Sequence, residues 1–176
     1  MEKTNWLEQF NQRTQLAKLL EINTLTEPFG LTLSQEEAQL VLAERNRTLK
    51  EQKRVEVGSS ILPELIREFC DSAYISQDNY TETLIRLEEI FFLYKNEMMD
   101  EISDDELLHF MKEQFETICC GDLDYLEGTC LNIFAQAIRA GYRDYRHNDG
   151  RRQYGEFDEV QRWDPELYRE AVKEWN

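Results

Sequence analysis

The sequence predicts an all-α protein: a compact bundle of about five main helices around a central apolar helix, followed by a C-terminal arm. Three observations favour this fold class. Only 7 Gly and 3 Pro among 176 residues provide too few turns for a many-stranded β fold. Hydrophobic residues make up 41% of the chain, which is enough for a folded core. They also recur at the three- and four-residue spacing of helices that bury one face.

The first helix is expected over residues 6–22, and an imperfect apolar stripe runs along it. Pro28 and Gly30 mark the break that follows, because proline removes a backbone donor and glycine permits a turn. The stripe consists of Trp6, Phe10, Ala17 and Leu20.

The start of the second helix is marked by a clearer sequence pattern than that of the first. Ser34 and Glu37 form a capping box, in which each side chain accepts a hydrogen bond from the other residue's amide. We expect this helix to extend to about Lys53. Residues 55–58 look extended, and a short helix is expected over residues 60–70. The inward face of the second helix is predicted to comprise Ala38, Val41, Leu42 and Leu49.

The most apolar helix is expected at about residues 79–98, capped by Asp78. Its large apolar residues alternate four- and three-residue spacing, which indicates one buried face. Further apolar residues widen that face nearly all round, so this helix is expected at the centre of the bundle. The predicted buried residues are Tyr80, Leu84, Leu87, Phe91, Tyr94 and Met98.

Two further helices complete the predicted body. Ser103 is the expected N-cap of the fourth, and the acidic residues after it favour the positive end of the helix dipole. The fifth is expected from about Leu123, with Gly141 just beyond its end. The fourth is predicted to bury Leu108, Met111, Phe115 and Ile118, and the fifth Leu126, Cys130, Phe134, Ala137 and Ile138.

Residues 1–141 are predicted to form one helical domain, and residues 142–176 a C-terminal arm. Asp164 and Pro165 carry the cap and first-turn signals of a short helix in this arm. So short a helix is marginal alone, and we therefore expect it to pack on the body or on a partner. The arm also contains arginines that are expected to lie over acidic residues: Arg143, Arg146, Arg151 and Arg152.

The net charge of −16 is unevenly distributed. Residues 64–127 contain 18 acidic and 4 basic residues, whereas residues 45–54 contain 5 basic residues and 1 acidic residue. A field of this sign repels nucleic acids and anionic membranes, and it favours solubility or basic protein partners. We expect a protein partner or self-association, no nucleic acid and no membrane. The N-terminus has no export signal pattern, so a cytoplasmic location is expected.

The four cysteines suit a reducing compartment. Adjacent Cys119 and Cys120 cannot bridge each other without distorting the peptide between them, and no C-x-x-C pair occurs. We predict no disulfide and no bound zinc, with all four cysteines, Cys70, Cys119, Cys120 and Cys130, serving as small apolar residues.

Several short segments together carry a resemblance to a known family. They are residues 29–34 (FGLTLS), 54–58 (RVEVG), 69–72 (FCDS), 94–97 (YKNE), 103–107 (SDDEL) and 110–112 (FMK). Over about residues 29–141 the chain resembles an uncharacterised bacterial family of small proteins. That family has no known function, so the resemblance implies no activity, substrate or site.

Glu106 and His109 have the Glu-x-x-His spacing found in di-iron helical bundles. Such a site requires a second motif of this kind, and Asp144 with His147 is a poor match. First-turn pairing with the helix dipole explains Glu106 more simply, with His109 as a partly exposed residue. The acidic cluster at residues 100–106 lacks the ligand spacing of an EF-hand. We therefore predict no metal, although further carboxylates are available at Glu88, Glu89 and Glu97.

The sequence contains no nucleophile elbow and no glycine-rich phosphate loop. The predicted function is a non-enzymatic protein–protein interaction module or accessory subunit with an acidic surface and no cofactor. The alternative is a metal-dependent enzyme, or enzyme subunit, that uses helix carboxylates. A third hypothesis is that the acidic segment mimics a nucleic-acid surface.

Overall fold

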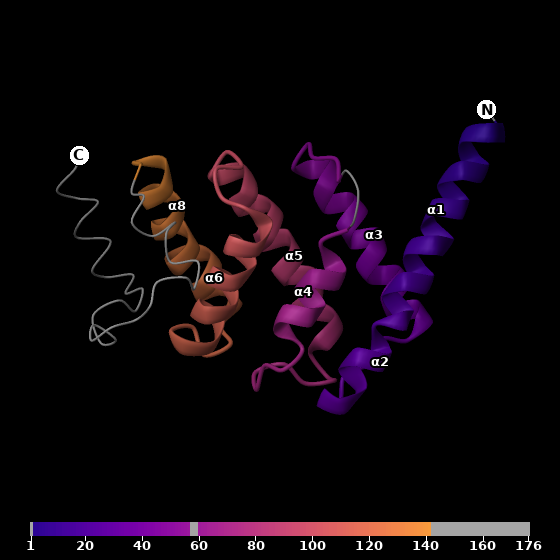
Figure 1. Ribbon diagram of the computed structural model, residues 1–176, viewed down its shortest axis with the longest axis horizontal. Helices are drawn as coiled ribbons and strands as arrows, with labels where there is room; N and C mark the ends of the chain where they lie inside the picture. Colours follow the sequence, from indigo (N-terminus) through magenta and orange to yellow (C-terminus); the bar gives the residue numbers. More distant parts are fainter. Residues whose placement is uncertain (1, 57–59, 142–176) are drawn as a thin grey trace. The chain divides into compact units, whose positions relative to one another are not determined.

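The computed structural model describes residues 2–56 and 60–141, and its regular structure there is helical (Figure 1). No strand occurs in these ranges, which confirms the all-α class. Within the same ranges, no helix combines the length and apolar character needed to span a membrane. The predicted arm at residues 142–176, with its arginines and short helix, lies outside the described residues. The domain boundary at residue 141 stays a prediction.

The chain divides into two compact units, residues 1–89 and residues 90–176, and the division falls within helix α5 (Tyr80–Glu97). The first unit also contains α1 (Glu2–Glu21), α2 (Asn23–Thr26), the 3-10 helix η1 (Glu27–Phe29), α3 (Gln35–Glu51) and α4 (Leu62–Phe69). The second unit also contains α6 (Asp104–Thr117), α7 (Leu123–Tyr125), the π-helix η2 (Leu126–Leu131) and α8 (Asn132–Arg139).

Helix α1 packs on α3 through a different face from the apolar stripe found in the sequence. Leu19 is buried, whereas Trp6, Phe10 and Ala17 of the stripe are exposed and Leu20 is half-buried. In Figure 1 the first turns of α1 stand apart from α3. The stripe therefore does not contribute to the core of this unit.

The segment between α1 and α3 is fixed by side-chain hydrogen bonds. Gly30 has a φ of 76°, and this left-handed conformation ends η1. The Asn23 amide group then donates to the Leu33 carbonyl and accepts from the Leu33 amide, both at 2.8 Å. Thr26 Oγ1 donates to the Leu31 carbonyl at 2.6 Å. These bonds hold the buried Leu31 and Leu33 just ahead of α3.

Both helices predicted to begin after a serine do so, each with a complete capping box. Glu37 N donates to Ser34 Oγ at 3.1 Å, and Ser34 N donates to Glu37 Oε2 at 2.7 Å. Ser103 and Glu106 repeat the arrangement at 3.2 and 2.9 Å. Because these bonds satisfy amides that a first turn leaves unpaired, they fix the starts of α3 and α6.

The buried residues follow the predicted faces closely. On α5, every residue of the predicted stripe that the helix carries is at most 5% exposed, and Met98 beyond its end is also buried. On α3 and α6 the predicted faces are buried except Leu42 and Ile118, which are half-buried. The stripe residues of α5 are Tyr80, Leu84, Leu87, Phe91 and Tyr94.

The fifth predicted helix is interrupted. Residues Leu126–Leu131 form the π-helix η2, with α7 before it and α8 after it. All five predicted core residues are nevertheless buried, and Gly141 has the expected left-handed φ, 80°. A π turn inserts one residue into the helical repeat, so the side chains after it are rotated relative to an uninterrupted α-helix.

Candidate functional site

The most unusual side chain of the first unit is a buried arginine. Ala38, Val41 and Arg45 share the buried face of α3, so the helical repeat itself carries the guanidinium of Arg45 inward. Arg45 is only 5% exposed. A buried guanidinium is stable only when carboxylates and hydrogen-bond acceptors surround it.

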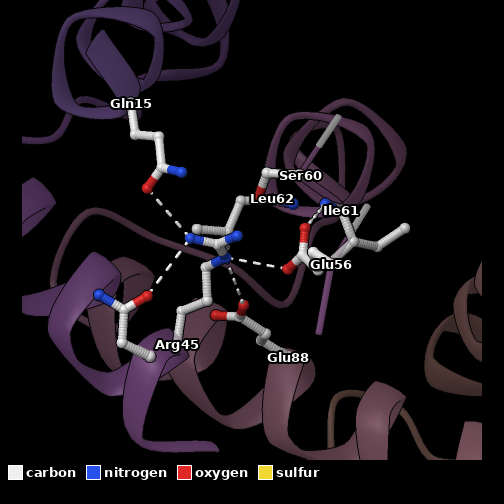
Figure 2. Close-up of polar contacts among 8 residues, drawn as sticks. Gln15, Arg45, Glu56, Ser60, Ile61, Leu62 and Glu88 are labelled. Carbon is white, nitrogen blue, oxygen red and sulfur yellow. Dashed lines mark hydrogen bonds and ion pairs between the residues drawn. The ribbon is translucent and has the colours of Figure 1, made fainter. Parts of the chain in front are cut away.

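Figure 2 shows how those acceptors converge on Arg45. Arg45 Nε donates to Glu56 Oε1 at 2.9 Å, and Glu88 Oε1 lies 4.0 Å from the same nitrogen. Arg45 Nη1 donates to Gln15 Oε1 at 3.1 Å and more weakly to Asn46 Oδ1 at 3.4 Å. We call Arg45, Glu56 and Glu88 the buried charge cluster. It joins α3, the segment before α4, and α5.

Glu56 is held from two sides. Its Oε1 accepts from Arg45, while Oε2 accepts from the Ile61 amide at 3.1 Å. Ile61 immediately precedes α4, and Ser60 Oγ accepts from the Leu62 amide at 3.3 Å. The start of α4 is therefore tied through Glu56 to the guanidinium on α3.

Glu88 differs from Glu56, because neither of its carboxylate oxygens has a hydrogen-bond donor among the described residues. Its side chain is 1% exposed. Burial raises the pKa of Glu88 to about 9, the negative charge of Glu56 adds to the rise, and Arg45 opposes it. At 4.0 Å the attraction to Arg45 does not offset the loss of solvation, so Glu88 is protonated at neutral pH. One positive and one negative charge then remain in the cluster.

Replacing Glu88 with glutamine is expected to remove a pH dependence of stability. The folded-state pKa lies above the ordinary value of 4.5, so the folded protein holds a proton that the unfolded chain releases between about pH 4.5 and 9. Stability therefore falls as pH rises through that window, by at most about 1.4 kcal/mol per pH unit. The stability of Glu88→Gln relative to the parent should therefore increase by about 4 kcal/mol between pH 5 and pH 8.

Urea unfolding at both pH values measures this difference. Glu89→Gln is the matched control, since Glu89 is the next residue on α5 but lies at the surface, 3.0 Å from Arg47. An unchanged pH profile in Glu88→Gln would show that Glu88 is ionised in the folded protein.

A groove between α1 and α3 adjoins the buried charge cluster. It has a volume of about 330 Å³, and both carboxamide and apolar side chains line it. Gln15 and Asn46 line the groove and also accept from Arg45, so they connect the groove to the cluster. The other lining residues are Gln9, Gln12, Arg13, Leu16, Gln39, Leu42 and Ala43.

Glu106 and His109, the pair with metal-ligand spacing, are both exposed. The Glu106 carboxylate closes the capping box of α6. Glu89 pairs with Arg47 at 3.0 Å, and Glu97 pairs with Arg139 at 3.2 Å. Over residues 2–56 and 60–141, no group of three or more His, Cys, Asp and Glu side chains is placed to hold a metal ion. Nothing in those ranges favours the metal-dependent alternative, and His147 lies outside them.

Sequence reasoning missed the buried charge cluster. Arg45 belongs by sequence to the basic segment 45–54, but it is buried, whereas Arg47, Lys50 and Lys53 of that segment are exposed. The signal was present in the helical repeat, because Arg45 is four residues after Val41 on the predicted inward face. The positions of Glu56 and Glu88 relative to Arg45 depend on long-range folding and have no local signature.

Comparisons with known proteins identify the family alone. No curated protein and no solved structure matches the chain significantly. A family model does match, over residues 18–144, and this range includes the buried charge cluster but not the first turns of α1. The match confirms the resemblance seen in the sequence: the chain belongs to DUF6323, a family of unknown function.

Proposed function

We propose that this chain is a non-enzymatic protein-interaction module or accessory subunit with an acidic surface, and that it binds its protein partner through the start of α1. The observation that carries the proposal is a cluster of three large apolar side chains with no cover in the described structure. Trp6 is 64% exposed, and Leu7 and Phe10 are each 59% exposed. We call these three residues the α1 apolar face.

The α1 apolar face has the composition of a binding hot spot. The rings of Trp6 and Phe10 stack with centroids 5.8 Å apart and an interplanar angle of 19°. Stacked rings form a preordered surface, and burying aromatic side chains dominates the energetics of many protein interfaces. Three large apolar residues within five positions also exceed the scattered exposure that is normal for a soluble surface.

The groove extends this surface along α1. Gln9 and Arg13 line the groove, and each is three residues after an aromatic residue of the α1 apolar face. Residues three apart are neighbours on a helix, so the face and the groove form one continuous strip. Carboxamides along the strip both donate and accept hydrogen bonds, which suits the polar groups of a partner chain. The net charge of −16 favours basic residues at the rim of that partner.

The proposal is tested with a photo-crosslinking amino acid introduced at Leu7 in the full chain. We expect one discrete covalent adduct, either with a second copy or with another protein, after irradiation in cells of the source organism. The matched control carries the same crosslinker at Glu8, which is also exposed and points to the side of α1 away from Trp6 and Phe10. The control position should give no such adduct.

The double variant Trp6→Ser/Phe10→Ser distinguishes binding from folding. Because both side chains are exposed, we expect its melting temperature to stay within about 2 °C of the parent while the Leu7 adduct is lost. A large fall in melting temperature would show that the α1 apolar face packs within the same chain. Equal adducts at Leu7 and Glu8 would show non-specific crosslinking. Either result refutes the proposed surface.

A further inference from the structure

The second unit contains a pair of cysteines that sequence spacing did not reveal. Cys119 Sγ and Cys130 Sγ lie 3.6 Å apart, and the two residues are 6% and 0% exposed. Both are free thiols, as are Cys70 and Cys120. The sequence predicts no disulfide, and the adjacent Cys119 and Cys120 cannot readily bridge each other. The structure instead brings together two thiols that are eleven residues apart.

Two irregular backbone segments bring these sulfurs together. Cys119 follows the end of α6, where Cys120 and Gly121 both have positive φ values, 48° and 87°. Gly121 N donates to the Phe115 carbonyl at 2.9 Å, which closes this helix end. Cys130 lies within the π-helix η2, and the π turn sets the direction of its side chain. η2 packs against α6, so the two thiols lie where these two elements meet.

We propose that Cys119 and Cys130 form a redox-active dithiol, which a peroxide oxidises to an intramolecular disulfide. Closure requires the sulfurs to approach each other by about 1.5 Å, since a disulfide bond is about 2.05 Å long. The left-handed turn at Cys120 and Gly121 is the part that can adjust, because a non-glycine residue is strained in that conformation. Disulfides of cytosolic proteins are usually transient bonds of this kind.

The two sulfurs have different roles in the reaction. The hydrogen bond between the thiols lowers the pKa of Cys130 and raises that of Cys119; burial and the nearby negative charge of Asp122 raise the latter further. Cys130 is therefore the thiol that ionises first, and the thiolate is the nucleophile.

The Cys130 thiolate attacks the peroxide, takes one oxygen as a sulfenic acid and releases hydroxide, which is protonated to water. The Cys119 sulfur then attacks the sulfenic sulfur, and the S–OH oxygen leaves with the Cys119 proton as a second water. With hydrogen peroxide, two thiols are thus oxidised to one disulfide and one peroxide is reduced to two waters. A dithiol reductant reverses the change by thiol–disulfide exchange.

The test uses the reduced full chain, treated with hydrogen peroxide under native conditions and then alkylated. We expect two of the four thiols to be lost, and the disulfide to link Cys119 to Cys130. Cleavage before aspartate separates the two cysteines at Asp122 and Asp124, so mass spectrometry identifies the bridge directly. Dithiothreitol should restore all four thiols.

Cys70 is the internal control, because it is also 6% exposed and its sulfur donates to the Arg67 carbonyl at 3.5 Å. Oxidation of the pair should be about tenfold faster than that of Cys70, since a thiolate is the reacting species. Cys120→Ser should keep the bridge, and Cys130→Ser should abolish it. A bridge that contains Cys120, or loss of Cys70 and the pair at equal rates, would overturn the proposal. So would four intact thiols after native treatment.

Discussion

Replacing Phe91 with alanine should lower the free energy of unfolding by about 3–5 kcal/mol, the largest effect expected from one truncation in this chain. The Phe91 side chain is 1% exposed on α5, and its ring meets Phe92 edge-to-face with centroids 5.4 Å apart. Truncation removes buried apolar area and leaves a cavity that close-packed neighbours fill only in part. Urea denaturation followed by circular dichroism measures the loss.

Phe29→Ala is the matched control for this substitution. Phe29 ends η1 and is 51% exposed, so the same chemical change should cost less than about 1 kcal/mol there. If Phe91→Ala cost no more than Phe29→Ala, α5 would not be the core helix that its periodicity indicates.

Arg45→Met should be almost as damaging, with an expected loss of about 3–5 kcal/mol. Methionine replaces the length of the side chain but not its charge or its donors. Among the described residues, Glu56 would then keep the Ile61 amide as its hydrogen-bond donor but lose the guanidinium, and the Gln15 carboxamide would lose its donor. The loss should be insensitive to salt, because ions do not screen a buried group effectively.

Arg47→Met provides the comparison on the same helix. Arg47 forms ion pairs with Glu44, Glu51 and Glu89, but its side chain is 50% exposed. Exposed pairs contribute little, so its replacement should cost less than about 1 kcal/mol and the cost should shrink as salt is added.

In a Glu56→Gln/Glu88→Gln background, Arg45→Met should cost less than in the parent, because no carboxylate is left unpaired. Equal costs in both backgrounds would show that the cluster residues act independently.

The parts of the fold that the sequence predicted are those that a short segment determines. The stripe of α5 and the capping boxes at Ser34 and Ser103 each arise from residues within one helix, where a fixed rise and rotation set which side chains coincide. The apolar stripe of α1 also recurs at helical spacing, yet Trp6, Phe10 and Ala17 of it are exposed. Periodicity identifies an apolar face but not the surface that packs against it. For α1, that surface depends on tertiary structure or on a partner.

The buried charge cluster and the Cys119–Cys130 pair could not be predicted from the sequence, because both depend on contacts between separate elements. Arg45 meets Glu56 and Glu88, and Cys119 meets Cys130, only because separate elements pack together. The π turn that aims Cys130 also has no reliable local signature, since Gly128 alone does not specify it. By contrast, the capping role of Glu106 was visible locally, because Glu106 stands at the third position of a capping box.

The corner between α5 and α6 has a consequence for the order in which the chain folds. The buried ammonium of Lys95 donates to the Ile102 carbonyl at 2.7 Å and lies 2.8 Å from Asp104 Oδ1. Met99 and Asp100, between these residues, both have left-handed φ values near 50°. All partners of Lys95 are within nine residues of it, so little chain entropy is lost when this helical hairpin closes. The buried charge cluster spans residues 45 to 88 and pays a larger loop-closure cost. Low contact order therefore favours the Lys95 corner as an early structure, and the distant Glu88 joins Arg45 later.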